Sequence, residues 1–514
     1  MVNSDTQATW DYHNGTKHPG GALLDASYIY DSSKRPLLFK VYTGIAPTKL
    51  PLDATARDAS ALQAIVGNDL VAGTDQKLDL ETLTRIFKFS TGITKSLPSQ
   101  TTGETILFRA AACTGALFHI EFYLVCGDIP GLEAGVYHLD PQGPSIRRLR
   151  VGDYRRVLVE ASGHEPGVEQ AAAILIATDV IWRNAVKYQA REYRHAFWDS
   201  GTILANTLAS ATAHHLSARV VAGFVDATVS RLLDLDPHRE LALALVPIGA
   251  EPGITPPSSL SLDPLNLAVR PIADYEIDFP AIKTMHAAST LFDPEAVAAW
   301  RGAAPGTLSL PPVGMLIPLQ PLTRDRLPVD PLEQVIMRRG STRQFTHEAI
   351  TFEQLSTALY QSLQGVAADF LAQPGMTLND VYLTIHAVEG LVPGTYVLRR
   401  DTWELELLKP GDFRATSGYL ALGQDLAYDA CVNIFFLADL HPILARFGNR
   451  GYRAAQFDAA ISAGRMYLAS YAQHFGATGL TFYDDAVTDF FSPHAQNKSV
   501  MFMIALGHKA ARRG

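Results

Sequence analysis

The sequence repeats itself, and this repeat limits the folds open to the chain more than any other feature. Gly131–Tyr137 (GLEAGVY) returns as Gly390–Tyr396 (GLVPGTY), a displacement of 390 − 131 = 259 residues. Two further segments return with the same displacement: Val151–Arg155 as Pro410–Arg414, and Arg191–Asp199 as Arg450–Asp458. A constant displacement over three segments indicates two copies of one domain. Two copies in one chain predict an intramolecular counterpart of a two-fold homodimer, a pseudo-dimer.

The repeat also predicts the domain boundaries. We expect an N-terminal copy at residues 1–250, a connector at 251–323 and a C-terminal copy at 324–514. The connector is rich in proline, which fixes φ and removes a backbone donor, so we expect it to be extended with little regular structure. Its one helix candidate follows Asp293 as N-cap, with Pro294 in the first helical position.

One length difference separates the copies. The helical pattern at Leu80–Ile93 resembles that at Phe352–Val366, but here the displacement is 352 − 80 = 272 residues. The second copy therefore lacks about a dozen residues between this helix and the next strand.

Apolar patterning predicts an α+β fold, with helices flanking a mixed sheet in each copy. The near-continuous apolar runs 241–249 and 500–508 predict central strands buried on both faces. Small residues in Ala196–His215 and Ala454–His474 permit close helix packing, as an interface between the copies requires. We expect two further helices to begin with an aspartate N-cap, in AGFVDATVSRLLDL and YDDAVTDFF.

Composition excludes several classes of protein. A net charge of −9 and a pI near 6.0 argue against a nucleic-acid-binding face. The three cysteines, Cys113, Cys126 and Cys431, form neither a disulfide framework nor a metal-ligand spacing. The N-terminus has no apolar signal segment, and no segment is apolar enough to span a bilayer. We therefore expect a cytoplasmic protein that binds no metal.

The two copies differ in where they carry positive charge. The second copy has RRGSTRQF at Arg338–Phe345 and a basic C-terminal tail with Lys509 and Arg512, whereas the first copy has no cations at either place. Arginine forks supply the paired, charge-assisted bonds that a phosphate needs, so Arg339 and Arg343 are candidate phosphate ligands. The alternative is a solvated helix end, where cations favour the macrodipole.

The first copy keeps a different motif. Arg109–Tyr123 (RAAACTGALFHIEFY) contains small residues before a strand, a backbone that can lie close to a flat ligand. Its second-copy counterpart has lost most of these small residues. The first copy also has Lys187–Arg194 (KYQAREYR), where the second has RFGNRGYR.

On these motifs the sequence resembles the nitroreductase-like flavoproteins, and within them the SagB/ThcOx-type dehydrogenases, over nearly its whole length. The resemblance implies a nitroreductase-like fold in two tandem modules, with FMN bound between them. It assigns phosphate and ribityl contacts to an RRSxRxF pattern and ring contacts to an RxAPSAGALYPxExY pattern. It assigns the flavin N5 edge to GATGLTFYDD and azoline oxidation to a Lys-Tyr pair. The implied FMN ligands are Ala112, Cys113, Thr114, Gly115, Ala116, Leu117, Arg338, Arg339, Ser341, Arg343, Gly479, Leu480, Thr481, Lys509 and Arg512.

The implied catalytic pair is Lys187 and Tyr188. A lysine or tyrosine can serve as acid or base if burial or a neighbouring cation moves its pKa toward neutrality. The alternative is a surface lysine beside a packing tyrosine. Arg191 and Arg194 could supply the cation, but both copies keep these arginines, which favours a structural role. Cys113, among apolar neighbours, is expected to be an inert packing residue.

Three functions remain open at this point. The first is an FMN-dependent oxidoreductase that oxidises a heterocycle or a peptide-derived substrate, with Lys187 and Tyr188 moving the proton. The second is an NAD(P)H-dependent nitroreductase or quinone reductase that needs no protein base. The third is a non-catalytic scaffold. The resemblance implies one intact flavin site per chain and one decayed site, in an intramolecular pseudo-dimer that could be a monomer in solution.

Overall fold

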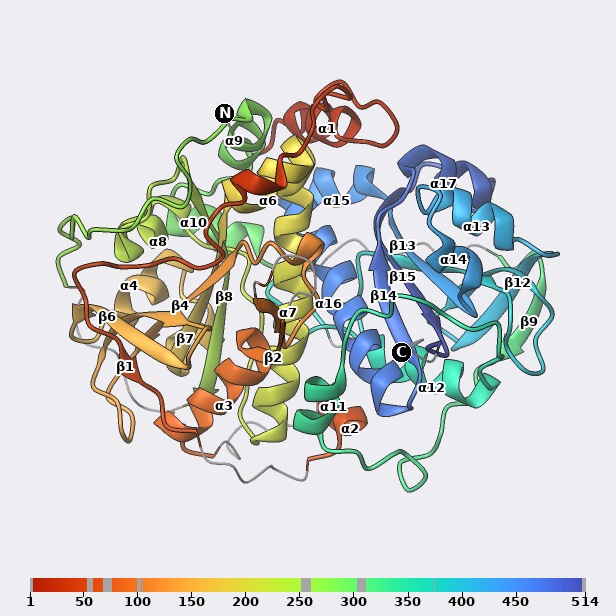
Figure 1. Cartoon of the computed structure of the whole chain (residues 1–514), viewed down its shortest axis with the longest axis horizontal. Coiled ribbons are helices and arrows are strands. Elements are labelled where there is room, and N and C mark those ends of the chain that lie inside the picture. The colour runs from red at the N-terminus through yellow and green to blue at the C-terminus, as the bar shows by residue number, and fades with distance from the viewer. Residues whose placement is uncertain are drawn as a thin grey trace.

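The structure is a computed structural model that describes residues 3–52, 59–67, 76–98, 103, 105–250, 260–302, 311–373 and 375–510. It confirms the α+β class and the duplication. Two antiparallel sheets lie on opposite sides of a central helix pair, α7 (Glu192–Ala213) and α16 (Arg450–Ala472), as Figure 1 shows. Each copy thus contributes one sheet and one long buried helix.

The first sheet has the order β1-β6-β5-β4-β7-β8, and the second has the order β14-β15-β13-β10-β11-β12-β9. All pairings between these strands are antiparallel, so the expected mixed sheet is wrong. Short turns join β4, β5 and β6, and a hairpin produces only antiparallel neighbours. The first sheet comprises β1 (Thr48–Lys49), β4 (Ile120–Cys126), β5 (Gly135–Asp140), β6 (Ser145–Val151), β7 (Ala171–Val180) and β8 (Glu240–Ala250). The second comprises β9 (Met315–Pro318), β10 (Asp380–Ile385), β11 (Gly394–Arg399), β12 (Glu404–Pro410), β13 (Val432–Ala438), β14 (Gly476–Leu480) and β15 (Ser499–Gly507).

The two apolar strands, β8 and β15, are buried as expected, but only β15 lies inside its sheet. β8 is the last named strand of the first sheet, so its predicted central position is wrong. In the second copy, β14 pairs with β15, the counterpart of β8, and so covers the corresponding edge. In the first copy, Ala218 and Val221 make only isolated bridges to β8. The first copy thus retains a shortened version of the outer strand.

Helices recur in the same places in both copies. The matched pairs are α3 (Leu80–Thr91) with α12 (Phe352–Ser362), α4 (Arg155–Ala161) with α13 (Arg414–Leu420), α6 (Ile181–Tyr188) with α15 (Leu440–Phe447), and α8 (Asp226–Leu233) with α17 (Asp484–Phe491). The residues missing from the second copy form a hairpin in the first, β2 (Ile93–Pro98) and β3 (Thr105–Arg109). The other short elements are α1 (Gln7–Gly15), η1 (Ser32–Lys34), α2 (Ala61–Ala64), η2 (Thr114–Ala116), α5 (Pro166–Gln170), η3 (Gln189–Arg191), α11 (Leu332–Arg338) and α14 (Asp425–Asp429).

The α7–α16 contact confirms the close packing expected from small residues. A Cβ on Gly201 of α7 would lie 2.5 Å from the Cβ of Ala460, and a Cβ on Gly464 of α16 would lie 2.6 Å from that of Ala205. Real Cβ atoms do not approach so closely, so each helix needs its glycine for the backbones to meet. These four residues bring the two halves of the chain into direct contact.

The connector contains more regular structure than expected. α10 (Pro294–Trp300) begins as predicted, with the Asp293 carboxylate accepting from the Ala296 N–H at 2.7 Å. α9 (Pro280–Ala288) precedes it, and β9 joins the edge of the second sheet. None of the helices in the described residues combines the length and apolar character needed to span a membrane.

The expected aspartate N-caps are wrong by one residue. Val225 and Tyr483 occupy the cap positions, and Asp226 and Asp484 are the first helical residues of α8 and α17. Both carboxylates instead accept from buried arginines of the other copy. Asp226 and Asp484 therefore serve the contact between the copies and do not cap their own helices.

Candidate functional site

A cavity of about 430 Å³ lies between the two copies and is lined by both. Cavities of roughly 300–1,000 Å³ are typical of small-molecule sites. We call this cavity the interdomain pocket. The first copy contributes Ala112, Cys113, Thr114, Gly115, Ala116, Lys187, Tyr188, His195, Trp198, Asp199 and Thr202. The second contributes Ser341, Arg343, Gln424, Tyr467, Thr478, Gly479, Leu480, Thr481 and Phe502.

The loop at residues 112–116 forms one wall, where the sequence placed the ring-facing motif. Its backbone has positive φ at Gly115, Ala116 and Phe118, at 62°, 53° and 52°, and it is strained at the last two residues. For a residue with a Cβ this conformation costs roughly 1–3 kcal/mol. Thr114 fixes the loop to α7 by donating its N–H and its hydroxyl to the Asp199 carboxylate, each at 2.7 Å. The loop is therefore rigidly held beside the pocket.

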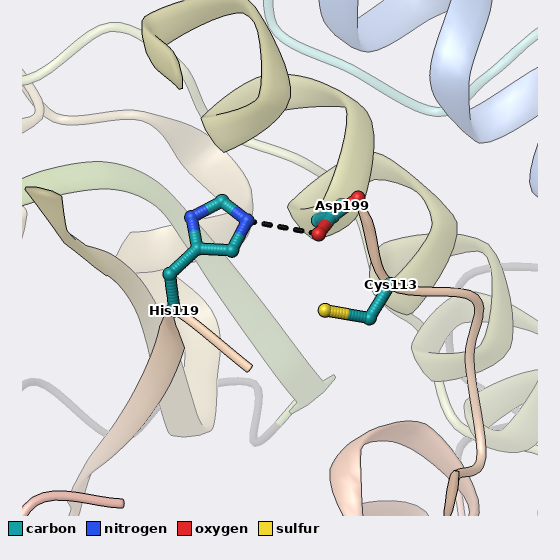
Figure 2. A group of neighbouring side chains, drawn as sticks. All are labelled: Cys113, His119 and Asp199. Atoms are coloured by element: carbon teal, nitrogen blue, oxygen red, sulfur yellow. Dashed lines mark hydrogen bonds and ion pairs between the residues drawn. The ribbon is translucent and has the colours of Figure 1, made fainter. Parts of the chain in front are cut away.

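Cys113 points from this loop toward Asp199, and His119 meets the same carboxylate from the other side (Figure 2). Burial, followed by the charge of Asp199, raises the pKa of the Cys113 thiol to about 12. A thiol in this state is a poor nucleophile. The structure thus favours the packing role expected for Cys113.

Lys187 and Tyr188 end α6 at the pocket wall. The Lys187 Nζ lies 5.1 Å from the centroid of the Tyr188 ring, a cation–π contact. Burial raises the pKa of Tyr188, and the carboxylate of Asp199 adds to the effect. The condition for Tyr188 to act as a base, a pKa moved toward neutrality, is therefore not met, because a buried phenol next to an anion keeps its proton. Tyr188 can donate a hydrogen bond or a proton but is not a base.

Gln189, the residue after this pair, has a backbone conformation that normally requires glycine. Its φ of 52° and ψ of −141° suit glycine, which stands at the second-copy counterpart Gly448 with φ 64° and ψ −159°. Gln189 instead makes two bonds to the backbone of Asp25, accepting from its N–H at 2.7 Å and donating to its carbonyl at 2.9 Å. These bonds hold a turn that glycine would adopt freely.

The second copy supplies the opposite wall. Ser341 and Arg343 reach the pocket from the arginine-rich motif, and residues 478–481 approach it from β14 and the loop that follows. The Thr481 hydroxyl is buried at this wall and has no hydrogen-bond partner among the residues that the structure describes. A buried hydroxyl without a partner is costly, and a polar group of a bound molecule could bond with it.

The other expected ligands of the cofactor lie elsewhere. Arg338 donates to the Tyr471 carbonyl at 2.6 Å and pairs with Asp330. Arg339 donates to the carbonyls of Arg109 and Ala110, each at 2.9 Å, and so fastens the second copy to the base of the ring-facing loop. These arginines and two further residues are not among those that line the pocket: Leu117, which is buried, and Lys509, whose Nζ lies 4.7 Å from the Tyr471 ring centroid. Arg512 lies outside the described residues.

Sequence reasoning missed several lining residues, namely His195, Trp198, Thr202, Gln424, Tyr467 and Phe502, together with the anchor Asp199. A signal existed for Asp199, because it ends the repeated segment Arg191–Asp199. The aromatic residues gave none, since they sit on buried helices and strands like other core residues. Only the fold brings them to the wall.

The equivalent position in the other half is filled by the chain itself. Residues 220–223 correspond to 479–482, and there the Asp369 carboxylate accepts from the N–H groups of Ala222 and Gly223 at 2.9 and 2.8 Å. A Cβ on Gly223 would lie 2.9 Å from the Trp300 ring, which packs on Phe447, the counterpart of Tyr188. Asp369 and Trp300 thus take the space that the interdomain pocket leaves open on the other side.

Comparison with known proteins decides the family. Residues 137–250 and 336–508, together more than half of the chain, match the nitroreductase family. The chain belongs to the nitroreductase family. The two matched segments fall in the two copies. Membership of this family implies that the chain is an oxidoreductase. The expectations of family and fold are thus confirmed.

Individual relatives cover different shares of this nitroreductase-family protein. A 203-residue stretch, 38% of the chain, is 30% identical to the trifolitoxin-processing protein TfxB of Rhizobium leguminosarum bv. trifolii and covers 54% of it. The chain thus spans about half the length of TfxB. A 142-residue stretch, 28% of the chain, is 27% identical to 70% of a protein of Methanocaldococcus jannaschii named as a nitroreductase. A crystal structure of an Anabaena variabilis protein, also named as a nitroreductase, matches with a TM-score of 0.76 and 25% identity, covering 98% of this chain and 99% of that one.

Proposed function

We propose that this chain is an FMN-dependent dehydrogenase of the SagB/ThcOx type that oxidises a heterocycle in a peptide-derived substrate, as in azoline-to-azole oxidation. One observation carries the proposal: a single pocket gathers the loop 112–116, the segment 479–481 and the pair Lys187–Tyr188 from both copies. The resemblance assigns these to the flavin ring, the flavin N5 edge and azoline oxidation. The name of TfxB, a peptide-toxin processing protein, supports a peptide-derived substrate.

The residues at the pocket fit FMN. The loop around Gly115 offers a flat backbone surface, and Thr481 brings a buried hydroxyl without a partner. Arg343 and Ser341 at the opposite wall supply a cation and a hydroxyl for a phosphate or ribityl group. FMN, when bound, would supply the hydride-accepting chemistry that no amino-acid side chain offers.

Lys187 and Tyr188 would then have different roles in proton transfer. Lys187 is the side chain that we assign to take a proton from substrate carbon, because it is the one amine among the described residues that line the pocket. Tyr188 keeps its proton, so it can only donate to the substrate. Trp198 and Phe502 make part of the wall apolar and limit the water that reaches the site.

A second candidate is an NAD(P)H-dependent nitroreductase. The names of the Methanocaldococcus and Anabaena proteins favour it. It would need no protein base, so Lys187 would be dispensable. Rapid NAD(P)H oxidation by the purified protein, retained in Lys187→Ala, would replace our first proposal with this one.

The deciding experiment is a visible absorption spectrum of the purified full chain, with the released FMN counted per chain. We expect about one FMN per chain, because Asp369 and Trp300 fill the equivalent position. Arg343→Ala should lower the FMN content, whereas Arg239→Ala, an exposed arginine paired with Asp236, should not. No bound flavin after reconstitution would contradict the proposal and leave the scaffold, and two FMN per chain would contradict the single site.

A further inference from the structure

A buried polar cluster lies directly behind the pocket wall. His119 Nε2 is 2.8 Å from an Asp199 carboxylate oxygen, and His119 Nδ1 is 2.7 Å from Asp179. Glu192 stands 3.6 Å from the same Nδ1. All four side chains are buried, yet none of these contacts was evident from sequence spacing. The fold assembles them from β7, α7 and the residue just before β4.

The geometry sets the charge of His119. Carboxylates only accept hydrogen bonds, so a ring with a carboxylate at each nitrogen donates from both and is an imidazolium. Burial alone would lower the pKa of His119, but its hydrogen bonds to Asp179 and Asp199 raise it well above its ordinary value. Burial and the neighbouring Asp179 raise the pKa of Glu192. Other titratable groups nearby are Arg109, Cys113, Tyr188 and His195.

The cluster acts on the pocket through a single residue. Asp199 accepts from both donors of Thr114, and Thr114 begins the strained turn that lines the pocket. With His119 as a further donor, the Asp199 carboxylate is fixed in orientation. Without that cation, the buried Asp199 carboxylate would remain with fewer partners, and its hold on the strained turn would weaken.

The second copy provides an internal comparison. Asp458, the counterpart of Asp199, also holds its loop, accepting from Leu378 N–H at 2.8 Å and the Thr377 hydroxyl at 2.6 Å. However, the positions of His119, Asp179 and Glu192 are occupied there by Leu378, Ala438 and Gly451. The helix-to-loop contact therefore does not require the cluster. His119, Asp179 and Glu192 thus occur in the copy whose loop lines the interdomain pocket.

We propose that His119 is a positioning residue of the interdomain pocket, a buried cation that keeps the Asp199 carboxylate aligned so that the turn 114–118 holds its strained shape against the cofactor. The identity of that cofactor as FMN rests on the function proposed above. The positioning role itself concerns only residues of this chain.

The first test needs neither a variant nor a ligand. In the full chain labelled with ¹⁵N-histidine and free of FMN, both ring nitrogens of His119 should remain protonated from pH 6 to pH 9. A ring with one N–H at pH 7 would overturn the proposal. The exposed His474 provides a reference signal in the same spectra.

The second test uses His119→Leu, which introduces the residue found in the second copy. His138→Leu is the matched control, because His138 is also buried in the first sheet and bonded to a carboxylate, Glu121, at 3.1 Å, but does not line the pocket. In the ligand-free chain, the Thr114 amide should exchange at least tenfold faster in His119→Leu than in the control. Equal exchange in both variants would overturn the proposal.

FMN binding separates this inference from the function on which it rests. His119→Leu should bind FMN at least tenfold more weakly than the control, with a shifted visible spectrum, whereas wild-type affinity should not change between pH 6 and pH 9. Unchanged affinity and spectrum in His119→Leu would refute the positioning role and leave the proposed function intact. A wild-type chain that binds no FMN would refute the proposed function, and the amide exchange of Thr114 would still decide the role of His119.

Discussion

Asp226 and Asp484 make the same interdomain contact in opposite directions. Each begins a helix of its own copy, and each carboxylate accepts from two buried arginines of the other copy. The pairs are Arg450 and Arg453 with Asp226, at 2.6 and 3.0 Å, and Arg191 and Arg194 with Asp484, at 3.0 and 2.6 Å. The two contacts are thus related by the pseudo-two-fold axis, and they explain why both copies keep these arginines.

Removing either carboxylate should destabilise the whole chain. In Asp226→Asn or Asp484→Asn, two arginines would stay buried without a counter-charge, which typically costs roughly 3–5 kcal/mol. Asp485→Asn is the control, because Asp485 pairs with Lys17 at the surface and its side chain is 72% exposed. That variant should lose less than about 1 kcal/mol. Urea denaturation would measure all three, and equal losses would show that the buried pairs do not hold the copies together.

The same pairs predict loss of stability in acid. Burial alone would raise the pKa of Asp484, but Arg191 and Arg194 more than offset this and hold it well below its ordinary value. A depressed pKa means that the unfolded chain takes up the proton first, so stability is lost as pH falls below about 4. The free energy of unfolding should fall less steeply with pH in Asp484→Asn. Identical slopes in wild type and variant would contradict the assignment.

Asp369 predicts a pH dependence of opposite sign. Burial raises its pKa to about 6, although the N–H groups of Ala222 and Gly223 act the other way. The folded chain then binds the proton more tightly, so this residue's contribution to stability decreases as pH rises from about 4 to about 6. The change is on the order of 2 kcal/mol. Asp369→Asn should remove it, as thermal unfolding across this range would show, and a variant that kept the full decrease would refute it.

Much of the fold was predictable because the sequence contains two copies of one domain. The constant displacement predicted two copies, and the small residues of α7 and α16 predicted their close contact. The edge position of β8 was not predictable, because its apolar sequence reports burial and not which strand lies beside it. Hydrophobic patterns identify elements better than they identify neighbours.

Part of the site was predictable, because some of its residues belong to local sequence motifs. Local motifs marked the loop 112–116 and the pair Lys187–Tyr188, which do meet in one pocket. Arg339 shows where this reasoning stops, since a buried guanidinium near backbone carbonyls binds those carbonyls, whatever its motif. His119 shows the opposite failure. Its acidic partners lie far away in the sequence, so no spacing could reveal them.

Substitutions at Tyr188 and Lys187 should reduce turnover to different extents. Tyr188→Phe removes a proton donor whose pKa is raised, so activity should fall by roughly 10²-fold without a change in FMN content. Lys187→Ala removes the proposed base and should abolish substrate oxidation, again with FMN retained. Steady-state kinetics with flavin counted in each preparation would test both. Full activity in Lys187→Ala would exclude the base assignment.

A matched pair of aspartates tests whether loop anchoring matters for binding. Asp199→Asn weakens the hold on Thr114 in the first copy, and Asp458→Asn weakens the hold on Thr377 and Leu378 in the second. Both should lower the unfolding temperature, because each removes charge-assisted bonds to a buried loop. Only Asp199→Asn should weaken FMN binding, by about tenfold, since only its loop lines the interdomain pocket. Equal loss of FMN affinity in both variants, measured by fluorescence titration, would mean that binding follows overall stability and not the shape of the turn.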